Sequence, residues 1–155
     1  MAPHEVPLVT EDLCAYCFEV LLAELQGVPR PSLRLPELSG GATSWYSNVC
    51  AMQVPGLFVT WNTSDGRLRG CMGALQPLEL ERGLADFAVK SSLGDRRFRP
   101  VSLEEVWTLT CRVSILHSFE TCRDALDWEV GPHGVHIAFT ATSGKLCPCS
   151  TASYS

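Results

Sequence analysis

Two short β-prone runs joined by an Asp-Gly turn constrain the fold of this chain more than any other feature. The first run is Leu57–Trp61, the second is Leu68–Gly73, and Ser64-Asp65-Gly66 lies between them. An Asp-Gly turn between such runs is a strong short-range signal of a hairpin. We therefore predict an antiparallel hairpin that turns at these three residues.

The second run of the hairpin contains the one local arrangement with chemical content. Side chains alternate between the faces of a strand, so Arg69, Cys71 and Gly73 share one face and Gly70 belongs to the other. A cation near a thiol favours the reactive thiolate, and glycines allow a close approach to the backbone. This pattern predicts a candidate site without identifying a substrate.

The rest of the chain mixes helices and strands. Apolar residues at helical spacing predict helices over Thr10–Gln26, Glu79–Leu93 and Thr121–Trp128, and alternation predicts strands over Trp107–Leu116 and Val135–Phe139. The regular strand–helix–strand period of a doubly wound sheet is missing. We therefore predict an α+β protein with a mostly antiparallel sheet and helices packed against it.

Composition narrows the classes of function. The chain has 155 residues and a formal net charge of -5, which argues against a nucleic-acid binder that relies on phosphate contacts. No run approaches the roughly 20 apolar residues of a transmembrane helix, and the start of the chain lacks the pattern of a signal peptide. We expect an intracellular protein of the nucleus, the cytoplasm or both, with its eight cysteines mostly reduced.

Two histidine and cysteine spacings invite a metal or redox interpretation. Cys14 and Cys17 lie three residues apart on a predicted helix, and His133 and His136 lie three residues apart at the last predicted strand. Neither pair has an obvious second set of ligands at suitable spacing. Packing in the core is the favoured interpretation for Cys14, Cys17 and Cys111, and we expect neither a metal site nor a cofactor.

Four segments of the sequence resemble the AMMECR-domain family. They are Leu57–Trp61, the hexad Leu68–Gly73, Asp95–Phe98, and Asp127–Gly131 together with His133–Val135. The family form of the hexad has isoleucine where this chain has Met72. The resemblance implies an AMMECR-like domain over residues 10–139, with a loop insertion at 43–54 and a divergent, disordered tail at 140–155.

The resemblance also implies a site around the hexad, but little mechanism. The residues expected to bind a ligand are Arg69, Gly70, Gly73, Asp95 and Arg97. One hypothesis is a regulatory or interaction module whose cleft is built around the hexad strand, with a protein or a small anionic ligand as its partner. Neither a nucleic acid nor a membrane is expected as a partner.

The alternative hypothesis is an enzyme that uses Cys71 as a nucleophile in thiol or group-transfer chemistry. His133 is then the candidate base and Glu129 the residue that orients it. The competing structural interpretation has Cys71 buried in a central strand, the glycines serving close packing and Glu129 pairing with an arginine.

Overall fold

The computed structural model of the protein describes residues 11–34, 52–129, 134–140 and 146–151. They belong to two compact units, Met1–Ser118 and Phe119–Ser155. No helix within the described ranges combines the length and the apolar character needed to cross a membrane.

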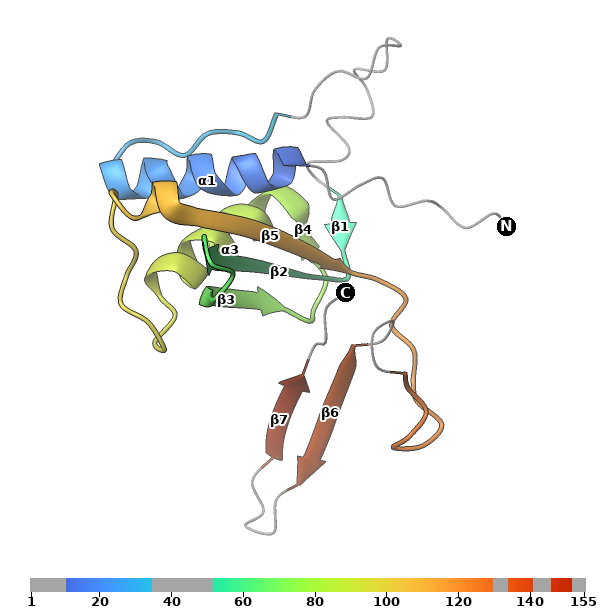
Figure 1. Cartoon of the computed structure of the whole chain (residues 1–155). Helices are drawn as coiled ribbons and strands as arrows, with labels where there is room; N and C mark the ends of the chain where they lie inside the picture. Colours follow the sequence, from blue (N-terminus) through green and yellow to red (C-terminus); the bar gives the residue numbers. More distant parts are fainter. Residues whose placement is uncertain (1–10, 35–51, 130–133, 141–145, 152–155) are drawn as a thin grey trace. The chain divides into compact units, whose positions relative to one another are not determined.

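The first unit is built on a three-stranded antiparallel sheet (Figure 1). Its strands lie in the order β3 (Leu68–Ala74), β2 (Gly56–Thr63) and β5 (Leu109–Leu116). The predicted hairpin is confirmed, because β2 pairs antiparallel with β3 and the Gly66 N–H donates to the Thr63 carbonyl at 2.8 Å in the turn. The predicted third strand is confirmed from Leu109 onward, after the short 3-10 helix η1 (Val106–Thr108).

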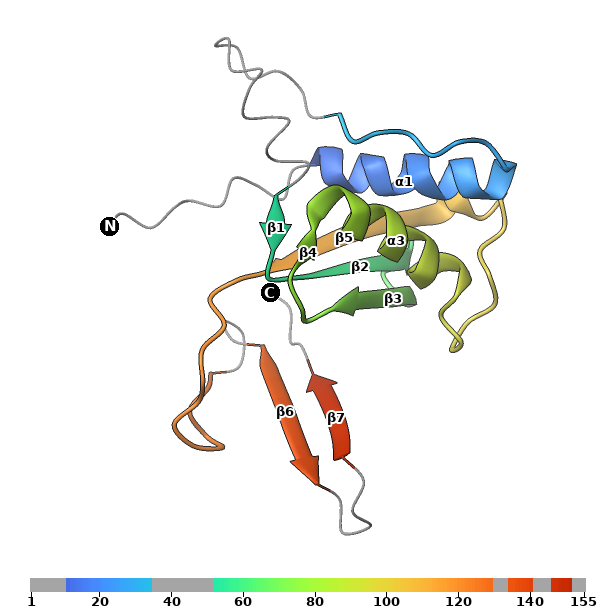
Figure 2. The same ribbon diagram turned by 180° about the vertical axis from the view of Figure 1, so that it is seen from behind.

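Two helices, α1 (Glu11–Gln26) and α3 (Leu80–Leu93), pack on one face of this sheet (Figures 1 and 2). Trp61 in β2 contacts both helices and is 0% exposed. Its indole N–H donates to the Ala88 carbonyl of α3 at 3.2 Å, and its ring lies 4.9 Å, edge to face, from Phe18 of α1. The α+β fold with helices packed against an antiparallel sheet is therefore confirmed.

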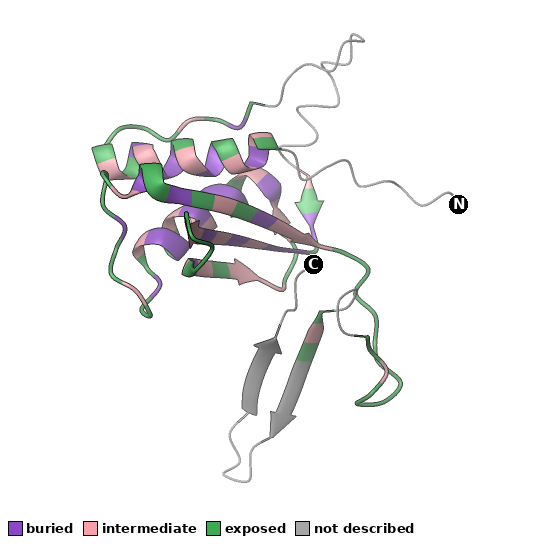
Figure 3. Cartoon of the chain, in the orientation of Figure 1, coloured by how far each residue is buried: buried purple, intermediate pink, exposed green. Residues whose placement is uncertain are grey.

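The core lies between the helices and the sheet, where the buried residues gather (Figure 3). Alternate residues of β2, namely Leu57, Val59 and Trp61, are fully buried, while Phe58 and Thr60 on the other face are half-buried. At about 25 cal/mol per Å² of apolar area removed from water, burial of this face supplies the main driving force for folding. The sheet therefore has a helix-covered face and a more open face.

A short ladder lies beside the start of α3. Strand β1 (Gln53–Val54) pairs antiparallel with β4 (Leu78–Glu79), and the Leu80 N–H donates to the Met52 carbonyl at 2.9 Å. The loop insertion was predicted for residues 43–54. Residues 43–51 lie outside the described residues, and Gln53–Val54 at the end of the predicted insertion form β1. The insertion itself stays a prediction.

The second unit contains a hairpin of β6 (Val135–Thr140) and β7 (Leu146–Thr151). The predicted strand at residues 135–139 is confirmed. Residues 140–155 were expected to form a disordered tail, but Leu146–Thr151 within this range form β7, which pairs along the whole length of β6; residues 141–145 and 152–155 lie outside the described residues. The sequence of this segment shows no alternation of apolar residues, so periodicity did not predict a strand. Hydrogen bonds between backbone groups can pair two strands without such alternation.

The predicted helix at Thr121–Trp128 is wrong, since this segment forms bends and turns. The Asp124 carboxylate accepts the Leu126 N–H at 2.8 Å, and the Asp127 carboxylate accepts the Arg123 N–H at 2.9 Å. Aspartate side chains that bond nearby backbone groups compete with the helical hydrogen bonds. This local competition explains why apolar spacing was misleading here.

Candidate functional site

The candidate site lies on β3, one of the two edge strands of the three-stranded sheet. In the observed register Gly70 lies opposite Trp61, and Cys71 lies opposite Thr60. Gly70 therefore belongs to the helix-covered face, and Cys71 belongs to the more open face, as the alternation predicted. Cys71 is half-buried on this edge strand, which differs from the structural interpretation that placed it in a central strand.

The two hexad glycines permit close packing. A Cβ atom at Gly70 would lie 2.0 Å from the Ser91 carbonyl oxygen of α3. A Cβ atom at Gly73 would lie 2.2 Å from the Leu57 carbonyl oxygen. Both positions thus exclude any larger side chain, and ligand binding by Gly70 and Gly73 stays a prediction.

Asp95 and Arg97, in the loop after α3, are bound to the backbone of Cys71. The Cys71 N–H donates to Asp95 Oδ2 at 3.1 Å, and Arg97 Nη2 donates to the Cys71 carbonyl at 3.3 Å. Arg97 also donates to Asp95 through its backbone N–H, Nε and Nη2, at 3.1, 3.0 and 2.6 Å. We call this arrangement the Asp95–Arg97 clip, and it brings three predicted site residues together.

The ionic states in the clip follow from these bonds. Hydrogen bonding to Arg97, aided by the N–H groups of Cys71 and Arg97, holds the pKa of the Asp95 carboxyl far below its usual range despite burial. The same bond raises the pKa of Arg97, and a charge on Cys71 would raise it further. The clip is therefore an ion pair at neutral pH.

Arg69 is held by a carboxylate that the sequence did not reveal. Its Nε and Nη2 donate to the two carboxylate oxygens of Glu105 at 2.5 and 3.0 Å, and its side chain is only 12% exposed. This bidentate bond lowers the pKa of Glu105. The third nitrogen of Arg69, Nη1, is buried and has no hydrogen-bond partner among the described residues.

Phe98 lies close to both guanidinium groups. The Cζ atom of Arg69 is 5.9 Å from the ring centroid, and the Cζ atom of Arg97 is 5.5 Å from it. Cation–π contact adds to the carboxylate bonds in fixing these two side chains. We call Arg69, Arg97 and Phe98 the arginine pair site.

The Cys71 sulfur has a neighbour that the hairpin register implies. The Thr60 hydroxyl donates to Cys71 Sγ at 3.1 Å, and these residues are directly opposite on β2 and β3. Arg69 was expected to supply the charge beside the thiol, but Glu105 already neutralises its guanidinium. Arg97, which is itself paired with Asp95, is the arginine whose pKa a thiolate at position 71 would raise.

The described structure does not place the other two proposed catalytic residues relative to Cys71. His133 lies outside the described residues. Glu129 belongs to the second unit, whereas Cys71 belongs to the first. Their roles as base and orienting residue stay predictions.

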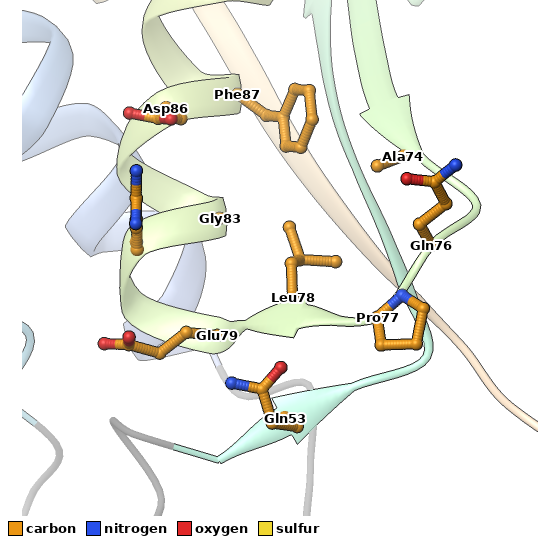
Figure 4. A pocket seen from close by; sticks show the side chains of 10 residues that line it. Gln53, Ala74, Gln76, Pro77, Leu78, Glu79, Gly83, Asp86 and Phe87 are labelled. Atoms are coloured by element: carbon orange, nitrogen blue, oxygen red, sulfur yellow. The ribbon is translucent and has the colours of Figure 1, made fainter.

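A hollow of about 400 Å³ lies at the far end of β3, between the β3–β4 connection and α3 (Figure 4). Leu78 and Phe87 line one side of it, and Ala74 and Gln76 line the other. It contains none of the predicted site residues, so it differs from the expected cleft around the hexad. The described part of the chain also holds no group of three or more His, Cys, Asp or Glu side chains arranged to bind a metal ion.

Comparison with known proteins identifies the family. The family model described as AMMECR1 matches residues 14–154, and the chain belongs to this family. The match reaches into the segment that we expected to be a divergent tail.

Similar proteins occur in plants, fungi and archaea. An uncharacterised protein of Arabidopsis thaliana is 37% identical over 133 residues, which cover 83% of this chain and 55% of that protein. An uncharacterised protein of Schizosaccharomyces pombe is 39% identical over 134 residues, covering 84% and 63% of the two chains. The crystal structure of an uncharacterised Pyrococcus horikoshii protein matches with a TM-score of 0.50 at 26% identity, covering 66% of this chain and 48% of that one. The chain therefore spans between 48% and 63% of the length of these relatives.

Proposed function

We propose that the protein is an interaction module that binds a partner through an anionic group at the arginine pair site. The observation that carries this proposal is that Arg69 and Arg97 are both fixed beside Phe98, each by its own carboxylate. Guanidinium groups that are already ordered lose less entropy when they bind. Their planar donors suit carboxylate and phosphate groups.

The charge around this site supports an anionic partner. Arg96, Arg97 and Arg99 are all exposed. No described carboxylate lies within ion-pair distance of Arg96 or Arg99, and the charge of Arg99 helps to lower the pKa of Glu105. Together with Arg69, this region contains four arginines and only three carboxylates, those of Asp95, Glu104 and Glu105. This local excess of positive charge contrasts with the chain's net charge of -5. A protein segment or small molecule with a few negative charges therefore fits better than a nucleic acid.

A binding titration with a matched control tests the proposal. We expect inorganic phosphate, and more strongly a short oligoglutamate peptide, to shift the backbone amide resonances of residues 95–99 and 69–71 in the full chain. Arg97→Gln should weaken peptide binding about tenfold, the equivalent of one lost charged hydrogen bond. Arg67→Gln is the control, because Arg67 is also an exposed arginine paired with an aspartate two residues away. Equal effects of the two substitutions would refute a specific site.

A second candidate is an enzyme that uses Cys71 as a nucleophile. The contact of its sulfur with the Thr60 hydroxyl and the charge of Arg97 favour this candidate. Native Cys71 should then react with iodoacetamide faster than Cys111, whose pKa is raised, and Arg97→Ala should slow the reaction. Site-resolved mass spectrometry measures both rates, and labelling of Cys71 no faster than Cys111 would remove the nucleophile.

We also infer an intracellular location, in the nucleus, the cytoplasm or both. All five described cysteines, Cys14, Cys17, Cys71, Cys111 and Cys122, are free thiols. Free thiols in this number suit a reducing compartment. Localisation of the tagged full chain by microscopy, with thiol trapping in cell lysates, tests this inference.

A further inference from the structure

Three cysteines meet where α1 crosses β5. Cys14 and Cys17 lie three residues apart and so project from the same side of the helix. Cys111 lies opposite Trp61 in the register of β2 and β5, so it belongs to the helix-covered face of the sheet. All three pack with the hydrophobic core.

The three thiols lie close enough to influence one another's pKa values. The pKa of Cys14 responds to hydrogen bonding with Cys111 and with the Val113 backbone, and the pKa of Cys111 responds to hydrogen bonding with Cys14 and Cys17. Cys17 is 0% exposed, whereas Cys14 and Cys111 are only partly buried. The Cys14–Cys111 pair is therefore the part of the cluster nearer to solvent.

We propose that Cys14 and Cys111 are a redox modification site and form a disulfide between α1 and β5 when a peroxide reaches the protein. One sulfur attacks the peroxide and becomes a sulfenic acid, with release of one water. The second thiol then displaces the sulfenic oxygen as a second water, and the S–S bond forms. Two thiols lose two electrons and two protons, and the peroxide is reduced to two waters.

The environment makes this pair slow to react and stable when reduced. Hydrogen bonding from the Cys14 thiol to Cys111, together with burial, raises the pKa of Cys14. For Cys111 the bond with Cys14 acts to lower the pKa, but the bond with Cys17 and burial outweigh it and raise the pKa. Because thiolates are the reactive form, the pair responds to a strong or sustained oxidant. It is independent of the arginine pair site.

The disulfide has a mechanical consequence. It joins the first helix to the last strand of the first unit, so the closed loop contains β2, β3 and α3. A cross-link over such a long loop restricts the unfolded chain strongly. Oxidation should therefore stabilise the unit against unfolding and fix α1 on the sheet.

The test uses the full chain with Cys50, Cys122, Cys147 and Cys149 replaced by serine, so that Cys14, Cys17, Cys71 and Cys111 remain. After hydrogen peroxide treatment and blocking of free thiols, peptide mapping without reduction should find the Cys14–Cys111 linkage. The melting temperature should rise by at least about 5 °C, and dithiothreitol should reverse the rise. Mapping in the unsubstituted protein gives the same readout if the substituted one fails to fold.

Single substitutions complete the test. Cys14→Ala should abolish both the linkage and the rise in melting temperature, while Cys71→Ala should leave both unchanged. A linkage of Cys14 to Cys17 instead, cross-links only between molecules, or oxidation without any gain in melting temperature would each overturn the proposal.

Discussion

The glycine at position 70 allows a sharp test of how closely α3 packs on β3. In Gly70→Ala the new methyl group would lie 2.0 Å from the Ser91 carbonyl oxygen and 3.1 Å from its carbon. To reach a separation of 3.0 Å, the two backbones have to move apart by about 1 Å, which is 3.0 minus 2.0. The obstacle is helix backbone, so no side-chain rotation relieves the clash.

Overpacking of this kind costs about 1–3 kcal/mol, and the rigidity of the obstacle places Gly70→Ala near the upper limit. We therefore expect a loss of about 3 kcal/mol in the free energy of unfolding, or a fall of about 6–12 °C in melting temperature. Urea and thermal unfolding followed by far-UV circular dichroism measure the two quantities.

The matched control is Gly94→Ala, the same chemical change just beyond the end of α3. Its nearest neighbour would be the Lys90 carbonyl oxygen at 3.0 Å, and its φ of -110° suits alanine. It should change the free energy of unfolding by less than about 1 kcal/mol. If both substitutions have the same small effect, the hexad glycine is not there for packing, and a direct role in binding gains support.

Three further predictions concern the ion pairs and the core. Folding lowers the pKa of Asp95, so its stabilising contribution is present above the unfolded pKa of about 3.9 and is lost as the pH falls below that value. Asp95→Asn should therefore reduce the loss of stability at acid pH, measured by urea unfolding at pH 2–7. Glu105→Gln leaves the buried Arg69 without its carboxylate and should lower the free energy of unfolding by about 1–3 kcal/mol. Glu104→Gln alters an exposed group and should lower it by less than about 0.5 kcal/mol. Equal urea midpoints for the two variants would contradict the bidentate pair. Trp61→Phe removes the indole hydrogen bond to α3 and should cost about 2 kcal/mol in the same assay, and an unchanged midpoint would show that this bond contributes nothing.

The features that sequence predicted well are those set by local rules. The Asp-Gly turn fixed the hairpin, and strand alternation placed Cys71 and Gly70 on opposite faces. The same register, extended across the hairpin, would have identified Thr60 as the neighbour of Cys71. Helical spacing located α1 and α3 because each buries one apolar side against the sheet.

The features that sequence missed depend on contacts between distant segments. Glu105 lies far from Arg69 in the chain and resembles an ordinary helix-capping residue, so nothing local identifies it as the partner of that arginine. Phe98 belongs to a segment that matches the family, but nothing local in the sequence indicates that it lies beside both guanidinium groups. Cys14, Cys17 and Cys111 were assigned to packing, which is correct, but their influence on one another's pKa values emerges only when α1 is placed on β5.

The Asp95–Arg97 clip also bears on how this protein avoids self-association. An edge strand exposes amide and carbonyl groups that can pair with a strand of another molecule, and β3 carries the exposed apolar side chains of Leu68 and Met72. At Cys71 both backbone groups are already occupied by one carboxylate and one guanidinium. An incoming strand would have to displace an ion pair before it could form its first hydrogen bond at the centre of β3. Residues of the proposed binding site would in this way also protect the edge of the sheet from aggregation.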